Sequence, residues 1–160
     1  MELLDRLGGK RVLVIADLYL DRYIFGRPSR ISREAPIMVL DEERQEDRLG
    51  GGAAPALQLA ALDYEVAVAG VIGDDRAGQI IQALLAVAGI DAGAVLVDPT
   101  RPTTTKTRVV AEGFFLFPQQ VVRVDRQERA AVGTDLTTAL SAAVAASPAD
   151  AILVSDYRSG

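Results

Sequence analysis

The sequence contains no cysteine and no histidine. Without cysteine there is no disulfide framework, no thiol nucleophile and no zinc–thiolate site. Without histidine there can be no His-based catalytic triad, no histidine general base and no histidine metal ligand. A chain without disulfides also fits a reducing compartment. We therefore expect a cytoplasmic protein that binds no metal of its own.

Long runs of one residue type are also missing. The net charge of −5 is spread along the chain, and no stretch is rich in lysine or arginine, so nucleic acid is not an expected partner. The longest apolar runs, such as residues 66–72, are far too short to cross a bilayer. The acidic N-terminal stretch is unlike a secretory signal. We expect neither a nucleic-acid nor a membrane partner.

Short apolar runs alternate with helical patterns over most of the 160 residues. The patterns predict strands over residues 11–16, 37–41, 65–72, 94–97 and 151–155, and helices over residues 53–62, 75–88 and 135–146. Thr134 or Asp135 could cap the last helix, and Gly73, Asp74 and Asp75 form a turn and cap for the second. Such alternation is typical of βαβ units, so we predict one α/β domain with a parallel sheet.

Several β-rich stretches do not fit this alternation. They cover residues 19–25, 103–111 and 120–125, and the charged residues 42–48 are either an exposed strand or a turn. Residues 26–30 (GRPSR) interrupt the first of them. We predict a separate small sheet from these pieces. The last predicted strand, at 151–155, looks like sheet interior and would leave an apolar edge, so we expect a dimer or larger species.

Three glycines, at positions 50–52, precede the first predicted helix. They could let a ligand approach the N–H groups at the helix N-terminus, or they could form a tight, closely packed turn. Their spacing matches neither the dinucleotide-binding nor the P-loop pattern. Pro55 falls in the first turn of the helix, where its missing N–H is not needed.

Two carboxylates follow predicted strands of the parallel sheet. Asp17 follows the first strand and Asp156 follows the last. In open α/β sheets, ligands bind at the carboxyl edge where these residues lie. A carboxylate there can accept hydrogen bonds from ligand hydroxyls, although Asp17 could also be an ordinary turn or cap residue.

Five stretches occur in one order along the chain: residues 12–40, 48–79, 101–110, 121–126 and 152–160. Together they resemble the first half of the PfkB (ribokinase-like) sugar kinases, and most of all the heptose-7-phosphate kinase domain of bifunctional ADP-heptose synthases. The resemblance implies a Rossmann-type α/β/α sandwich, with residues 1–160 forming the N-terminal part of a single kinase domain. It also implies a small β-sheet lid at about residues 19–48 and 103–125, which closes over the sugar and often makes the dimer contact.

The resemblance further implies a reaction and a site. The reaction is the ATP- and Mg²⁺-dependent phosphorylation of the anomeric hydroxyl of a heptose 7-phosphate. The implied substrate-binding residues are Asp17, Gly51, Gly52, Lys106, Arg123 and Asp156. Lys106 shares a strand face with Thr104 and Arg108 and would lie near the substrate phosphate; a solvated lid lysine is the alternative. Asp21 and Arg22 are expected to be structural residues or to form pairs within the lid.

The chain departs from the family pattern at three positions. Pro55 stands where the family has an asparagine that contacts the sugar, Ser159 replaces a lysine, and Ala16 replaces a glycine. Losing one such hydrogen-bonding side chain from a buried site typically costs about 1–3 kcal/mol. Gln58, one helical turn on, could partly substitute.

The family's Gly-Ala-Gly-Asp motif, which carries the catalytic base and helps to form the ATP site, is absent from the sequence. We therefore predict no catalytic residue here, no activity of the chain alone and no cofactor bound to it alone. The first hypothesis is the sugar-binding and lid half of a heptose-7-phosphate kinase-like enzyme, either truncated or completed by a C-terminal kinase chain. The alternatives are a non-catalytic binding or dimerisation module that forms a homodimer through the lid, and a generic α/β domain.

Overall fold

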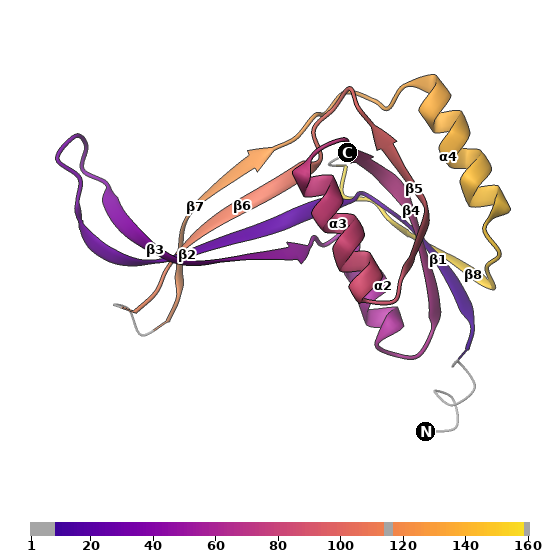
Figure 1. The fold of residues 1–160 in the computed structure, drawn as a ribbon, viewed down its shortest axis with the longest axis horizontal. Helices are drawn as coiled ribbons and strands as arrows, with labels where there is room; N and C mark the ends of the chain where they lie inside the picture. Colours follow the sequence, from indigo (N-terminus) through magenta and orange to yellow (C-terminus); the bar gives the residue numbers. More distant parts are fainter. Residues whose placement is uncertain (1–8, 114–116, 159–160) are drawn as a thin grey trace.

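Two four-stranded sheets organise the chain (Figure 1). The computed structural model describes residues 9–113 and 117–158. The central sheet is parallel, in the order β5 (Asp91–Asp98), β4 (Glu65–Gly73), β1 (Arg11–Ala16) and β8 (Ala151–Ser155). The projecting sheet has the order β3 (Met38–Leu49), β2 (Tyr19–Ile31), β6 (Thr104–Ala111) and β7 (Gln119–Arg126). The predicted α/β fold and the separate small sheet are both confirmed.

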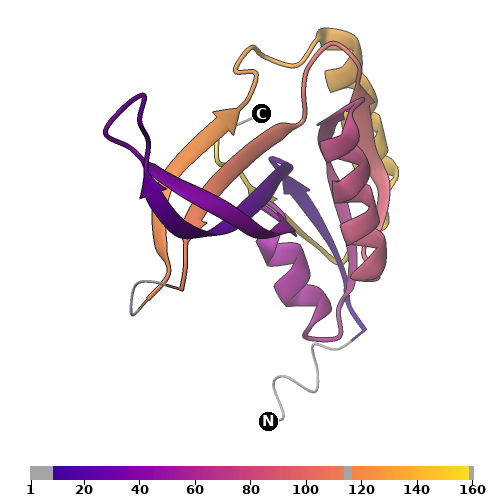
Figure 2. The same ribbon diagram turned by 60° about the vertical axis from the view of Figure 1, so that its left-hand side comes forward.

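Helices cover both faces of the central sheet (Figures 1 and 2). Helices α2 (Ala54–Ala60) and α3 (Arg76–Val87) lie on one face, and α4 (Thr134–Ala146) lies on the other. Side chains of β1 alternate between these faces: Val14 packs in the cluster with α2 and α3, while Leu13 packs with residues of α4. Both are fully buried. The central sheet therefore forms the hydrophobic core.

Strand β8 lies at the edge of the described sheet, as the predicted apolar edge requires, but its side chains are more exposed than a buried-type strand predicts. Within residues 9–113 and 117–158 it pairs with β1 alone. Ile152 and Val154 are 59% and 66% exposed, because α4 contacts β4 and β5 and leaves that side of β8 uncovered. An apolar run alone cannot distinguish a covered strand from an uncovered one.

Strand β2 does not end at the GRPSR stretch, contrary to the sequence pattern. It continues through Pro28 to Ile31, with register irregularities at Phe25/Gly26 and Pro28/Arg30. Strand β6 pairs with β2 only as far as Gly26, so beyond that point β2 is an edge strand that tolerates a residue without an N–H. Residues 42–48, which the sequence left open, belong to strand β3.

The helix starts are partly as predicted. Asp75 caps α3, and its carboxylate accepts a hydrogen bond of 3.0 Å from the Gly78 N–H. Pro55 lies in the first turn of α2, and the helix forms around it. The prediction for α4 was wrong, because its N-cap is Gly133. Thr134 and Asp135 lie inside the helix, where the Asp135 carboxylate in the first turn still complements the helix dipole.

Candidate functional site

Asp17 lies just after β1, at the carboxyl edge of the central sheet. Its carboxylate accepts a 2.8 Å hydrogen bond from the Tyr157 N–H, and its own N–H donates to the Ser155 carbonyl at 3.3 Å. These bonds join the ends of β1 and β8. Asp17 and Asp156 line one cavity of about 290 Å³, together with the end of β4 and the start of β6. The structure thus brings both predicted carboxylates to the edge where ligands of α/β sheets bind.

The glycine run packs directly against the segment between β1 and β2. A Cβ on Gly52 would overlap the Asp17 carbonyl oxygen, and a Cβ on Gly50 would overlap the ring of Tyr19. A Cβ on Gly51 would lie 2.5 Å from the Tyr19 hydroxyl oxygen and 3.2 Å from that of Tyr157. Close packing therefore accounts for the three glycines by itself, before any ligand is considered.

Tyr19 links the predicted site residues to one another, and sequence reasoning missed it. The residue is buried, and its hydroxyl lies against Gly51. Burial raises the pKa of Tyr19, and the opposing effect of hydrogen bonding with the Gly51 backbone, which lowers the pKa, is smaller. The ring makes an edge-on contact with Tyr157, with centroids 6.1 Å apart, and the Lys106 Nζ lies 3.8 Å from its centroid. Tyr19 thus joins Gly51, Tyr157 and Lys106.

The cations of the projecting sheet differ in their partners. Arg108, on the same strand face as Lys106 as predicted, forms an ion pair with Asp21, and Arg22 pairs with Asp47. Burial alone would lower the pKa of Arg108, but the hydrogen bond and charge of Asp21 raise it above its usual range. Within the described ranges, no carboxylate lies within ion-pairing distance of the Lys106 ammonium.

Of the predicted site residues, Asp17 and Asp156 line the cavity, whereas Gly51, Gly52, Lys106 and Arg123 are not part of its wall. Arg123 lies opposite Arg108 in the pairing of β6 with β7, whereas Lys106 lies opposite Asp125. Its guanidinium pairs with the Asp125 carboxylate at 2.9 Å and is about half exposed. The structure therefore places Arg123 on the same sheet as Lys106 but not in the wall of the cavity.

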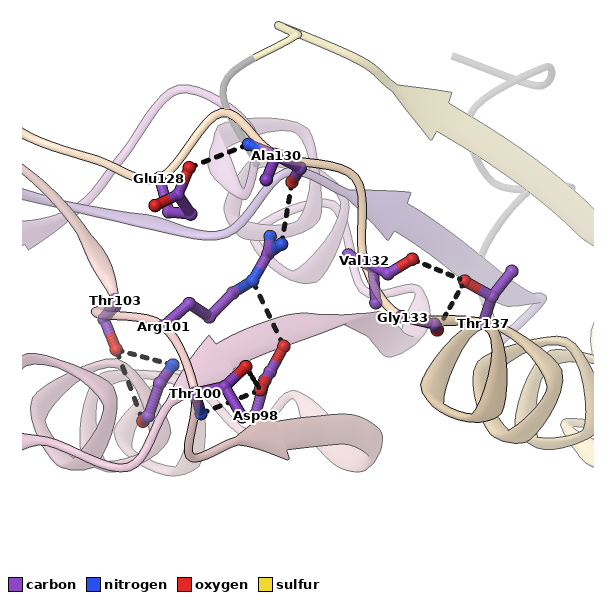
Figure 3. Close-up of polar contacts among 10 residues, drawn as sticks. Asp98, Thr100, Arg101, Thr103, Glu128, Ala130, Val132, Gly133 and Thr137 are labelled. Atoms are coloured by element: carbon purple, nitrogen blue, oxygen red, sulfur yellow. Dashed lines mark hydrogen bonds and ion pairs between the residues drawn. The ribbon is translucent and has the colours of Figure 1, made fainter.

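A second set of polar residues contributes Arg101, Thr103 and Glu128 to the wall of the cavity (Figure 3). The side chain of Arg101 is nine-tenths buried; it donates a 2.7 Å hydrogen bond to the Ala130 carbonyl and pairs with Asp98 at 3.1 Å. Hydrogen bonds from the Thr100 hydroxyl and N–H hold the pKa of Asp98 below its usual value. Arg101 and Glu128 both line the cavity. No local sequence pattern marked either of them.

Thr103 and Asp75 join the two sheets beside this wall. The Thr103 hydroxyl accepts a 2.8 Å hydrogen bond from the Gly73 N–H at the end of β4 (Figure 3). The Thr103 N–H donates to the Asp75 carboxylate at 3.2 Å, and Arg126 of β7 lies 3.4 Å from it. Burial would raise the pKa of Asp75, but the hydrogen bonds and the Arg126 charge together lower it.

The remaining expectations concern Ser159, Pro55 and the implied cofactors. Ser159 lies outside the described residues, and Pro55 is part of α2. In the part of the chain that the structure describes, no three acidic residues gather closely enough to hold a metal ion. We assign no step of a reaction to Mg²⁺. No helix in this part is long and apolar enough to cross a membrane.

The fold and site define an α/β domain of the ribokinase-like class: a parallel sheet with a cavity at its carboxyl edge and a second sheet rising beside that edge. Residues 11–147 match the model of the pfkB family carbohydrate kinases. The chain belongs to this family.

Curated relatives agree with this assignment. The chain is 43% identical over 150 residues to the bifunctional protein HldE of Geobacter metallireducens. This alignment covers 92% of this chain and 30% of that protein. It is 40% identical over 158 residues to HldE of Pelobacter propionicus, in an alignment that covers 98% of this chain and 31% of that protein. The chain therefore spans about a third of the length of these relatives.

Solved structures show the same fold. Phosphofructokinase-2 from Escherichia coli superimposes with a TM-score of 0.66 at 18% identity, covering 92% of this chain and 44% of that one. A carbohydrate kinase from Agrobacterium tumefaciens gives a TM-score of 0.62 at 19% identity, covering 91% and 45%. The predicted ribokinase-like fold is confirmed.

Proposed function

We propose that this chain forms the sugar-phosphate-binding portion of a heptose-7-phosphate kinase, with the projecting sheet as its lid. The observation that supports this most is the clustering of Asp17, Gly51, Gly52 and Lys106 around Tyr19, at the carboxyl edge of the central sheet. The HldE relatives, about 40% identical over nearly the whole chain, support the same proposal.

The proposed roles follow from the chemistry of the side chains. An ionised carboxylate accepts hydrogen bonds and donates none, so Asp17 and Asp156 suit the hydroxyl groups of a sugar. An ammonium with no carboxylate within ion-pairing distance suits a phosphate group, so Lys106 would bind the 7-phosphate. Closure of the projecting sheet over the sugar would exclude water from the site.

Transfer of the phosphoryl group needs more than these residues. The anomeric hydroxyl must lose its proton to a base, and the charge on the moving phosphoryl group must be stabilised. The sequence contains no Gly-Ala-Gly-Asp motif to supply the base. In this proposal, the chain binds and orients the sugar phosphate, and groups outside these 160 residues complete the reaction.

Apolar exposure on β7 favours a second candidate, a dimerisation module. Val121, Val122 and Val124 are between 46% and 59% exposed, which is unusual for neighbouring valines on a strand. A homodimer that forms through the projecting sheet would bury them. Light scattering over a range of concentrations tests this candidate, and a monomer at every concentration would exclude it.

Calorimetric titration of the chain with a heptose 7-phosphate, without nucleotide, tests the main proposal. We expect saturable binding that is lost in Asp17→Asn and in Lys106→Ala. Lys10→Ala is the matched control, because Lys10 is the only other lysine and pairs with Asp150, which follows α4 and precedes β8, at the opposite end of the central sheet. If the unaltered chain shows no binding at millimolar ligand, the sugar-binding proposal is wrong and the dimerisation module is favoured.

A further inference from the structure

Tyr19 occupies an unusual position, because its ring contacts both the glycine run and Lys106 of the neighbouring strand β6. The side chain leaves the first residue of β2 and is 5% exposed. It packs so closely on the glycine run that a methyl group at Gly50 would overlap the ring. Its hydroxyl lies against Gly51, where a Cβ would be 2.5 Å from the hydroxyl oxygen. One side chain therefore fixes the backbone that the substrate is proposed to approach.

The same ring holds the Lys106 ammonium. Lys106 belongs to β6, which pairs with β2 in parallel so that Lys106 lies beside Asp21. The Nζ atom is nevertheless 3.8 Å from the centroid of the Tyr19 ring, well inside the range of a cation–π interaction. Asp21 pairs with Arg108 instead. The ring thus holds the lysine in place without cancelling its charge.

This arrangement distinguishes Lys106 from the arginines around it. Arg22, Arg108 and Arg123 each form an ion pair with a carboxylate, which leaves little of their charge for a ligand. A cation on an aromatic face keeps its full charge and can still bind an anion. Tyr19 therefore sets the distance between a positive charge and the Gly51 backbone.

We propose that Tyr19 is a positioning residue, which fixes the Lys106 ammonium next to Gly51 so that it binds the phosphate group of a phosphorylated sugar. The inference rests on the proposed function for the identity of the sugar. The position of Lys106 and its response to an anion can be measured separately from that identity.

The two lysines of the chain make a direct measurement possible. Reductive methylation with ¹³C-formaldehyde keeps the positive charge and gives lysine NMR signals from Lys106 and Lys10 alone, besides the α-amino group. A cation above an aromatic face experiences the ring current, so the Lys106 signal should be shifted upfield from that of Lys10. The shift should persist in Tyr19→Phe, which keeps the ring, and disappear in Tyr19→Leu.

Binding of inorganic phosphate and of a heptose 7-phosphate is then followed through the same signals, and by calorimetry on unmethylated protein. We expect Tyr19→Leu to weaken binding of both ligands about tenfold, and Tyr19→Phe to stay within about threefold of the unaltered chain. Binding of the unphosphorylated heptose should weaken less than binding of heptose 7-phosphate, because only the phosphorylated ligands use the lysine. In the Lys106→Met background, Tyr19→Leu should have no further effect on phosphate binding, because the residue acts through the lysine.

The outcomes separate the two proposals. If the Lys106 signal of the unaltered chain coincides with that of Lys10, Tyr19 does not position the lysine; this result needs no variant, so misfolding of Tyr19→Leu cannot obscure it. Equal phosphate binding by a folded Tyr19→Leu chain would also overturn the inference. If phosphate binds in a Tyr19-dependent way and heptose 7-phosphate binds no better, the inference stands and the proposed substrate is wrong.

Discussion

The central and projecting sheets are built from the same number of strands but are held together differently. In the central sheet, Leu13 and Val14 of β1 are fully buried between helices on both faces. In the projecting sheet, every residue of β7 is exposed. The central strands of that sheet, β2 and β6, do bury Leu20 and Val110. Charged and aromatic contacts hold the sheet as well, among them Arg22 with Asp47, Arg108 with Asp21, and Arg44 over the Phe25 ring at 3.7 Å.

The difference bears on how the site can work. Burial of apolar side chains makes a large contribution to stability, whereas ion pairs near the surface contribute little. Elements with few buried apolar contacts open at a lower free energy than the core. We call the central sheet the floor of the site and the projecting sheet, whose outer strand β7 is exposed, its cover, and we expect the cover to open at a lower free energy than the floor.

The largest predicted effect is on the floor. Replacing Leu13 by alanine leaves a cavity in the core and should destabilise the chain by about 2–5 kcal/mol. The matched change in the projecting sheet, Val124→Ala, removes methyl groups from a side chain that is 59% exposed and should cost less than about 0.5 kcal/mol. Urea denaturation measures both, and similar losses would mean that the two sheets do not differ as described.

A somewhat smaller effect is expected where the floor meets the cover. In Gly52→Ala the new methyl group would overlap the Asp17 carbonyl oxygen, so the loss of stability should be about 2–3 kcal/mol. Gly133→Ala is the control, because a Cβ there meets no described atom within 4 Å; as the N-cap of α4 it should cost less than about 1 kcal/mol. If the chain tolerates Gly52→Ala as well as the control, packing does not explain the glycine.

Local sequence patterns predicted the features that depend on residues close together in the chain. The strands and helices of the floor, the Asp75 cap and the shared face of Lys106 and Arg108 follow from spacing along the chain. Such features depend on residues two to four positions apart, which a single sequence displays directly.

Features that depend on distant segments could not be predicted in this way. The exposure of β8 depends on where α4 packs, and the continuation of β2 through Pro28 depends on where β6 stops pairing. The contact of Tyr19 with Lys106 depends on the register of β2 against β6, which joins residues 87 positions apart (19 and 106). Spacing within one segment contains no information about register between two.

Within the projecting sheet, the more buried ion pair, Arg108 with Asp21, should contribute more to stability than the more exposed pair, Arg123 with Asp125. Arg108 and Asp21 are 19% and 14% exposed, whereas Arg123 and Asp125 are 49% and 25% exposed. Asp21→Asn leaves Arg108 without its partner and should cost about 1–2 kcal/mol, while Asp125→Asn should cost less than about 0.5 kcal/mol.

Amide hydrogen exchange in β2 and β6 measures this effect. Faster exchange in the projecting sheet is expected for Asp21→Asn, with unchanged exchange in β1 and β4. If exchange accelerates equally in both sheets, the projecting sheet does not open independently of the floor.

The smallest predicted effect concerns Asp75, which joins the two sheets. Its carboxylate bonds to Gly78 and Thr103 and lies beside Arg126, and its pKa in the folded chain is lower than the ordinary value of 3.8. A group with a lowered folded pKa stabilises the fold above its unfolded pKa, and this stabilisation is lost as the pH falls through the folded value. Asp75→Asn keeps the shape and a capping oxygen but removes the charge, so it should cost about 0.5–1 kcal/mol at pH 7. The difference between the two chains in urea denaturation should shrink as the pH falls through and below 3.8. A difference that stays constant down to pH 3 would show that the charge of Asp75 does not help to hold the cover on the floor.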